Sequence, residues 1–241
     1  MIQIIKANEH HKNEMDWLST YYHFSFADYF DQNKMNYGPL RVFNDDTIQP
    51  ETGFDFHPHK EMEIITYVID GELEHEDSNG NHGIIKEGEI QVMTAGSGIL
   101  HSEYNHSKEK PLKLLQMWVV PDTKNLEPSW QQRKYPKQDR LDKLLQVVSP
   151  LGSSHDGILT IHQNASFYVS SLTPGAKIIH DLKPGRKSYM FVIDGQIQIN
   201  GTPMQTRDSA KVEGEGKLVI RSDKQTDLIL IDLPEKYSVK T

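Results

Sequence analysis

An eight-residue segment occurs twice in this chain, and no other feature limits the choice of fold as strongly. Residues 67–74 read Tyr-Val-Ile-Asp-Gly-Glu-Leu-Glu, and residues 191–198 read Phe-Val-Ile-Asp-Gly-Gln-Ile-Gln. In each copy an aromatic residue enters a predicted strand, Asp-Gly predicts a hairpin turn, and apolar and polar residues then alternate. A second turn follows each copy, at Asn79-Gly80 and at Asn200-Gly201. The shared order of strand, turn, strand and turn indicates an internal duplication.

The rest of the chain also favours an all-β fold. Short runs rich in Val, Ile, Tyr and Thr are separated by Gly, Asn, Asp and Pro, which is typical of a sandwich or barrel. The 241 residues suffice for one large domain or two modest ones. Residues 121–140 are rich in Pro, Lys, Gln and Asp, with Trp130 as the main apolar anchor, and predict a polar linker. We therefore expect domains at residues 1–133 and 134–241. Residues 141–148 fit either a short strand or a single helical turn.

The composition argues against several classes of function. The formal net charge of −8 disfavours binding to nucleic acid or to anionic membranes, both of which attract basic surfaces. No stretch approaches the roughly 18 apolar residues that span a bilayer, and the first residues turn polar before a signal-peptide core forms. A cytoplasmic location is the expectation. Because the chain has no cysteine, any metal must be held by nitrogen and oxygen.

Two short clusters of polar residues predict a metal site. His57 and His59 lie two residues apart, and so do His101 and Glu103. On an extended strand this spacing puts both side chains of a pair on one face, so pairs on facing strands could converge. Three imidazoles and one carboxylate form a ligand set that suits iron, nickel, copper or zinc. An octahedral metal with four protein ligands would keep two positions open, which favours a catalytic site over a structural one.

Glu63 is a competing carboxylate ligand. An extended strand rises roughly 3.3 Å per residue, which puts Glu63 about 13 Å along the chain from His59. Glu103 needs no bend in the chain to join His101. We therefore expect Glu103 as the fourth ligand, and Glu63 as a residue that orients an imidazole N–H.

Other histidines and aromatic residues have simpler interpretations. His75, His82 and His106 lie near predicted turns, where we expect them to be exposed. Trp118 alternates with polar neighbours and is a predicted core residue. An aromatic cluster near the N-terminus is predicted to pack over the outside of the first barrel. This cluster comprises Trp17, Tyr21, Tyr22, Phe24, Phe26, Tyr29 and Phe30.

Longer motifs resemble the pirin family of the cupin superfamily, in particular the bacterial pirin-like proteins described as quercetin 2,3-dioxygenases. The motifs lie at residues 23–29 (His-Phe-Ser-Phe-Ala-Asp-Tyr), 40–46 (Leu-Arg-Val-Phe-Asn-Asp-Asp), 57–59, 62–64, 93–99 (Met-Thr-Ala-Gly-Ser-Gly-Ile) and 101–103. The resemblance implies a bicupin of two consecutive β-barrel (jelly-roll) domains, and it also assigns Glu103 as a metal ligand. It implies a metal in the first barrel and a degenerate second barrel without a metal site. The second half agrees with that loss, because it lacks His-x-His near the repeat and its histidines, His155, His162 and His180, occur singly.

The resemblance also implies an activity. It predicts a quercetin 2,3-dioxygenase-type oxidoreductase that cleaves flavonols such as quercetin with dioxygen and releases carbon monoxide. A bound metal would lower the pKa of the flavonol 3-hydroxyl, and Glu103 would accept that proton as the catalytic base. Fe(II) is the expected metal, with nickel, copper, manganese or zinc as alternatives. Two other functions stay open: a non-catalytic, iron- or redox-responsive partner of a regulatory or metabolic protein, and an enzyme acting on another small phenolic.

Overall fold

The computed structural model describes residues 1–153, 156–214 and 216–240. These residues form 22 strands and three 3-10 helices, and they contain no α-helix. The all-β prediction is therefore confirmed. The chain divides into two compact units. The N-terminal unit comprises His11–Lys134, Leu159–Gln163 and Ser238–Thr241, and the C-terminal unit comprises Met1–His10, Tyr135–Ile158 and Asn164–Tyr237.

The elements of the two units have the following bounds. The N-terminal unit contains β2 (His11–Glu14), β3 (Leu18–Tyr22), η2 (Gln32–Lys34), β4 (Leu40–Ile48), β5 (Gly53–His59), β6 (Glu63–Asp70), β7 (Glu72–Asp77), β8 (His82–Lys86), β9 (Glu89–Thr94), β10 (Ile99–Asn105), β11 (Leu112–Val119), β12 (Ser129–Lys134) and β14 (Leu159–Ile161). The C-terminal unit contains β1 (Ile2–Ile5), η1 (Ala7–Glu9), η3 (Lys137–Arg140), β13 (Leu145–Pro150), β15 (Ser166–Leu172), β16 (Lys177–Asp181), β17 (Arg186–Asp194), β18 (Gln196–Ile199), β19 (Thr202–Gln205), β20 (Ser209–Glu213), β21 (Lys217–Ser222) and β22 (Thr226–Pro234).

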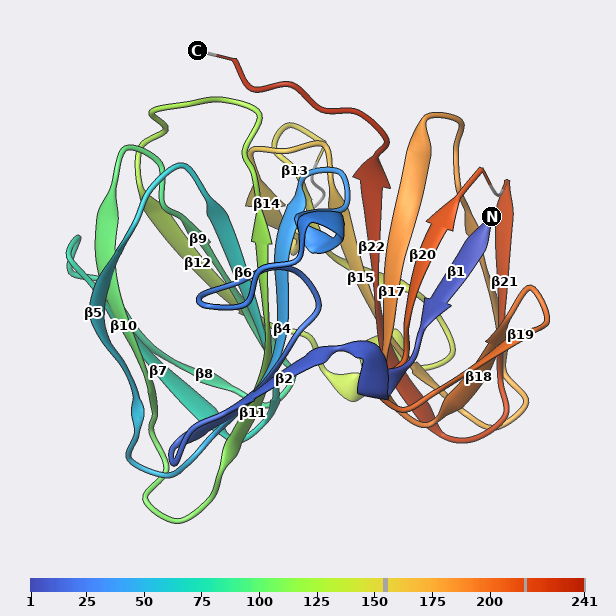
Figure 1. Cartoon of the computed structure of the whole chain (residues 1–241), viewed down its shortest axis with the longest axis horizontal. Helices are drawn as coiled ribbons and strands as arrows, with labels where there is room; N and C mark the ends of the chain where they lie inside the picture. Colours follow the sequence, from blue (N-terminus) through green and yellow to red (C-terminus); the bar gives the residue numbers. More distant parts are fainter. Residues whose placement is uncertain (154–155, 215, 241) are drawn as a thin grey trace. The chain divides into compact units, whose positions relative to one another are not determined.

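The two units share one strand order, as the internal repeat predicts (Figure 1). In the N-terminal unit β12-β9-β6-β11-β4-β3-β2 form one sheet and β5-β10-β7-β8 form the other. In the C-terminal unit β20-β17-β22-β15 repeat the order β9-β6-β11-β4, and β16-β21-β18-β19 repeat the order β5-β10-β7-β8. Neighbouring strands of both units, such as β6 with β11 and β16 with β21, are antiparallel, which suits barrels closed by short turns.

The two Asp-Gly turns are not hairpins, so that prediction is wrong. Asp70 ends β6 and Gly71 leads into β7, but these two strands lie in different sheets of the N-terminal unit. Gly195 connects β17 to β18 across sheets in the same way. Both glycines have φ near +100° (94° and 106°), where a side chain would be strained. The chain therefore uses Asp-Gly to cross between sheets, while the following Asn-Gly turns join the true hairpins β7/β8 and β18/β19.

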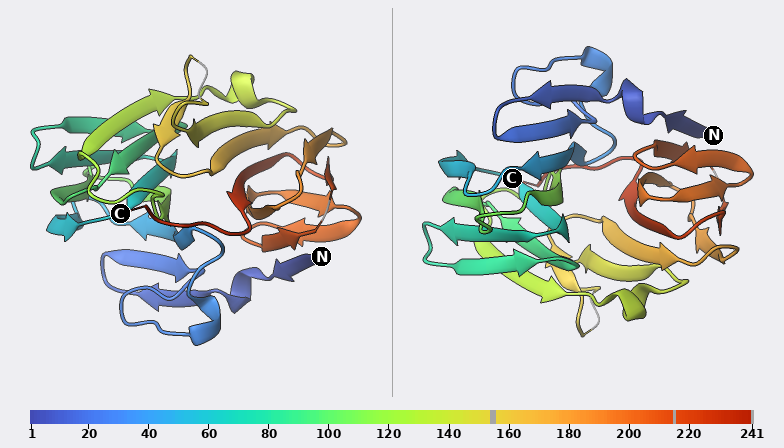
Figure 2. Two further views of the ribbon diagram at one scale, coloured as in Figure 1. Left: turned by 90° about the horizontal axis from the view of Figure 1, so that it is seen from above. Right: turned by 90° about the horizontal axis from the view of Figure 1, so that it is seen from below.

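The predicted linker contains regular structure. Residues 129–134 form β12, which pairs with β9 and extends a sheet of the N-terminal unit. Residues 145–150 form β13, so the strand alternative holds for the second half of the segment 141–148. β1 pairs with β20, and it lies beside the orange strands of the C-terminal unit in both views of Figure 2. The division at residues 133 and 134 stays a prediction about domains, and the compact units depart from it at residues 1–10 and 159–163.

The interiors of the two units differ in polarity. Aliphatic side chains fill the C-terminal unit, including Ile178 on β16 and Leu218 and Ile220 on β21. The N-terminal unit has smaller apolar clusters, one around Leu73, Ile85 and Leu114 and another around Ile64, Met93 and Ile99. Buried polar residues, namely Asp46, Thr66, His75, Gln91, His101 and Glu103, complete its interior. Strand alternation explains why these polar side chains point inward, because each shares a strand face with the residues two positions away.

Candidate metal centre

The three histidines predicted from sequence spacing converge in the N-terminal unit. Strands β5 and β10 are antiparallel, and His57 lies directly opposite His101. His59 lies opposite Ile99, one residue pair further along the same face. Nitrogen atoms of all three imidazoles lie within 4.8 Å of one another. Their ring centroids are 4.5 to 4.8 Å apart.

The spacing of the ring nitrogens fits a divalent metal. The Nε2 atoms of His57 and His101 are 3.1 Å apart. At that distance two lone pairs repel unless a proton or a cation lies between them. Two imidazoles that bind one metal at about 2.1 Å on adjacent positions have nitrogens about 3 Å apart. The Nδ1–H of His57 donates to the carbonyl of Asp55 at 2.7 Å, which leaves the lone pair on Nε2 facing the centre.

The electrostatics of the cluster keep the imidazoles of His59 and His101 neutral at pH 7. Burial, together with the neighbouring imidazoles of His101 and His57, lowers the pKa of His59 to about 4. Burial, with the imidazoles of His57 and His75, lowers the pKa of His101 to about 3. Neutral imidazoles have the free lone pair that a metal needs. Burial and mutual repulsion thus prepare this cluster for a cation.

Glu103 lies beside the histidines in a network of amide donors. Its Oε1 accepts hydrogen bonds from Gln91 Nε2 at 2.7 Å and Thr66 Oγ1 at 3.5 Å, and its Oε2 accepts one from Gln116 Nε2 at 2.6 Å. Glu103 lies within 4.8 Å, ligand atom to ligand atom, of His75 and His101. A shift of register on β5 puts Glu103 opposite Phe54. The structure thus places Glu103 next to His101, and its role as fourth ligand stays a prediction.

His75 was missed, and the prediction that it is exposed is wrong. Its side chain is fully buried on β7, directly opposite Glu103, and its ring stacks on Trp130 at 5.4 Å. Its Nε2 lies 3.3 Å from Asp77 Oδ2. Among the described residues, no group forms a hydrogen bond with the buried Nδ1 atoms of His75 and His101. The alternation of Leu73, His75 and Asp77 along a strand was the available signal. His82 and His106 are exposed as predicted.

A cavity of about 130 Å³ adjoins the cluster. Trp118, expected in the core and not in a pocket, lines this cavity and also packs against the apolar cluster around Ile64. Tyr22 and Phe26, expected over the outside of the barrel, line the cavity. The ring of Trp118 meets that of His59 edge-on at 4.8 Å. The lining residues are Leu18, Tyr22, Phe26, Asn44, Asp46, Phe54, His57, His59, Glu103, Gln116 and Trp118.

Asp46 is a second carboxyl group at this cavity that sequence reasoning missed. It lies on β4 and is only 4% exposed. Burial, together with the charges of Asp45 and Glu103, raises its pKa to about 7. A group with such a pKa carries a proton part of the time at neutral pH, which is typical of functional sites.

Comparison with known proteins gives this geometry its context. The pirin family matches residues 5–119, and the quercetinase C-terminal cupin domain matches residues 146–233. A quercetin 2,3-dioxygenase of Escherichia coli K12 is 39% identical over 97% of this chain and 99% of its own length. A pirin-like protein of Caulobacter vibrioides is 40% identical over 90% of this chain and 92% of its own length. The chain belongs to the pirin family.

Solved pirin structures agree with this assignment. The crystal structure of YhhW from Escherichia coli has a TM-score of 0.93 and 38% identity, and covers 98% of this chain and 99% of its own. A nickel(II) complex of YhhW has a TM-score of 0.92 at the same identity, over 97% of this chain and 99% of its own. The bicupin prediction is confirmed, and a divalent metal is supported. No helix in the described part of this pirin is long and apolar enough to cross a membrane.

Glu63 has a different role in this pirin from the one predicted. It is fully buried, and its Oε1 accepts hydrogen bonds from the backbone N–H and the Nδ1 of His162, at 3.1 and 3.0 Å. Its Oε2 accepts one from Thr94 Oγ1 at 2.8 Å. Glu63 therefore anchors the segment 159–163 within the N-terminal unit. His180 likewise pairs with a carboxylate, Asp232, at 3.2 Å, whereas His155 lies outside the described residues.

This ion pair predicts a pH-dependent stability. The hydrogen bond to Glu63 raises the pKa of His162 above its usual 6.5. The stabilisation is therefore complete below pH 6.5 and is lost as pH rises through the raised pKa. We expect His162→Gln to lower the free energy of unfolding of the N-terminal unit by about 1.5–3 kcal/mol at pH 6, and by less at pH 9, in urea titrations. The exposed His82→Gln control should change it by under about 0.5 kcal/mol. An equal loss for His162→Gln at both pH values would contradict this prediction.

Proposed function

We propose that this protein is a metal-dependent dioxygenase that cleaves flavonols such as quercetin with dioxygen. The observation that carries the proposal is the convergence of His57, His59 and His101 beside a cavity that His57, His59 and Glu103 line. Two relatives that are named quercetin 2,3-dioxygenase support it, because this chain aligns with nearly their whole length. We assign His57, His59, His101 and Glu103 as the metal ligands.

The protein's own groups would bind and deprotonate the substrate. When bound, a divalent cation supplies Lewis acidity, which lowers the pKa of a flavonol hydroxyl. Glu103 accepts the hydroxyl proton, and the amides of Gln91 and Gln116 hold its carboxylate in place. Phe26, Phe54 and Trp118 provide apolar walls for aromatic rings and restrict the access of water. We propose Fe(II) as the metal, and nickel, copper, manganese or zinc as alternatives that elemental analysis of the native protein distinguishes.

The proposal is tested by reaction with oxygen. Protein as isolated is mixed with quercetin without oxygen, and oxygen is then admitted while flavonol absorbance, oxygen uptake and carbon monoxide are measured. We expect all three signals to change together. Glu103→Ala should lower kcat by about 100-fold or more, because the proton acceptor and a ligand are both lost. The exposed Glu87→Ala should retain full activity.

A result without turnover would rule out the dioxygenase proposal. If wild-type protein contains metal but consumes no flavonol above the Glu103→Ala background, that proposal is wrong. Two functions would then remain, namely an enzyme acting on another small phenolic and a metal-responsive protein partner. The net charge of −8 suits a protein partner rather than a nucleic acid.

A further inference from the structure

The cavity at the histidines is too small for a whole flavonol. Its volume is about 130 Å³, whereas pockets that enclose molecules of drug size measure about 300–1,000 Å³. A flavonol has a fused two-ring system and a third ring attached to it. If its oxygen atoms face the histidines, the attached ring must lie elsewhere. This step rests on the proposed function.

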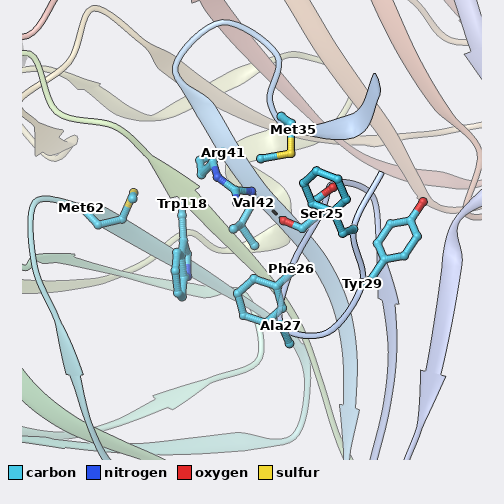
Figure 3. Close-up of a pocket in the computed structure, with 10 residues that line it drawn as sticks. Ser25, Phe26, Ala27, Tyr29, Met35, Arg41, Val42, Met62 and Trp118 are labelled. Atoms are coloured by element: carbon cyan, nitrogen blue, oxygen red, sulfur yellow. Dashed lines mark hydrogen bonds between the residues drawn. The ribbon is translucent and has the colours of Figure 1, made fainter. Parts of the chain in front are cut away.

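A second pocket adjoins the first and is large enough for the attached ring. It measures about 330 Å³ and is drawn in Figure 3. Phe26 and Trp118 line both pockets, so these two side chains form a shared wall. Their rings meet edge-to-face at 5.3 Å. The other lining residues are Ser25, Ala27, Tyr29, Phe30, Met35, Arg41, Val42 and Met62. Aromatic and thioether side chains of this kind suit a planar aromatic ring.

The shared wall is tied to the candidate metal centre. Trp118 Nε1 donates to Gln116 Oε1 at 3.2 Å, and Gln116 Nε2 donates to Glu103 Oε2 at 2.6 Å. The indole also contacts the imidazole of His59. These contacts hold the tryptophan in one orientation relative to the histidines. A ligand that touches Trp118 is therefore placed with respect to both pockets.

Arg41 supplies a cationic group to the second pocket. Its Nη1 donates to the carbonyl of Ser25 at 2.6 Å, and Figure 3 shows this bond beside Val42 and Met35. A guanidinium has five N–H donors and no acceptor, so further donors remain for a ligand. It prefers oxygen atoms that carry negative charge or accept hydrogen bonds strongly. A phenolic ring oxygen fits this description.

We propose that the second pocket binds the attached ring of a polycyclic phenol, and that Arg41 recognises a hydroxyl oxygen on that ring. The fused rings lie at the histidines, and Phe26 and Trp118 contact the bond between the two parts. The enzyme then selects flavonols hydroxylated on the attached ring over those that lack these hydroxyls. Arg41 acts in binding and specificity, and it makes no contact with the reacting atoms.

A matched pair of ligands tests the proposal. Quercetin carries two hydroxyls on the attached ring, and galangin has the same fused rings with no hydroxyl on the attached ring. Binding of each is measured without oxygen by calorimetry, using protein as isolated, and KM and kcat are measured with oxygen. We expect Arg41→Met to weaken quercetin binding and raise its KM about tenfold, with kcat and galangin binding nearly unchanged. Arg41→Lys should restore part of the difference. The control is Arg133→Met, which removes an exposed arginine of β12.

The outcomes separate this inference from the proposed function. If Arg41→Met affects quercetin and galangin equally, or neither, the inference is wrong even when the enzyme turns over both. The inference is also overturned if the wild-type protein does not bind quercetin. If the quercetin-specific loss of binding occurs without any turnover, the second pocket is supported and the dioxygenase proposal fails.

Discussion

His101→Ala is expected to abolish metal binding and to lower kcat/KM for quercetin oxidation by more than about 100-fold. His101 is the most deeply buried of the three histidines, its Nε2 faces His57 Nε2, and its ring lies 4.8 Å from that of His59. Its removal leaves two partly exposed imidazoles on β5. Metal per chain, measured after gel filtration, should fall from near one to near zero.

Three controls make the result of this substitution specific. His106→Ala removes an exposed histidine just beyond β10 and should leave metal content unchanged. His57→Ala alters a half-buried ligand and should lose metal without the packing change expected at His101. A strong chelator should reproduce the loss in wild-type protein, and added Fe(II) should reverse it. If the His101→Ala and His57→Ala variants both retain one metal per chain, the assigned centre is wrong.

Asp46→Asn is expected to stabilise the N-terminal unit at alkaline pH. Burial raises the pKa of Asp46 from 3.8 to about 7, so the folded protein keeps a proton that the unfolded chain has released. The stability of the wild type therefore falls as pH rises from about 4 to about 7, and the full cost persists above pH 7. Asparagine has no charge to bury. The gain in free energy of unfolding should reach about 2 kcal/mol at pH 8, with about 4 kcal/mol as the upper bound.

The pH profile distinguishes charge burial from a simple packing effect. Urea titrations of both proteins should give similar stability at pH 4, and the difference should grow through pH 5 and 6. Asp16→Asn, at an exposed position, should show no such trend. A gain for Asp46→Asn that is the same at pH 4 and pH 8 would refute this account. An ionisable carboxyl held inside a cavity at such a cost is typical of groups retained for function rather than for stability.

Local spacing puts His57 and His59 on one strand face, and the pairing of β5 with β10 brings His101 opposite His57, as the sequence allowed. The same reasoning failed for residues whose place depends on strand register. Asp46 and Trp118 come from β4 and β11, and only the pairing of these strands brings them to one cavity. Glu63 was expected near an imidazole of the centre, but its partner His162 lies 99 residues away in sequence.

The Asp-Gly pairs show a second limit of sequence reasoning. A positive φ at glycine is a local requirement, and Gly71 and Gly195 both meet it. The local pattern does not determine whether the next strand pairs with the previous one or joins the opposite sheet. That choice depends on how the whole barrel closes. The strand content was therefore predictable, and the connections between strands were only partly so.

The pairing of β1 with β20 has a consequence for biogenesis. Ile2 lies opposite Val212, so β1 is synthesised about 200 residues before its partner strand exists. The strands around the histidines, by contrast, are all synthesised by residue 134. We infer that the half that holds these histidines matures first, and that a fragment beginning at residue 134 leaves an open edge on β20. Such an edge invites aggregation, so the isolated second half should become soluble only when the first ten residues are supplied with it.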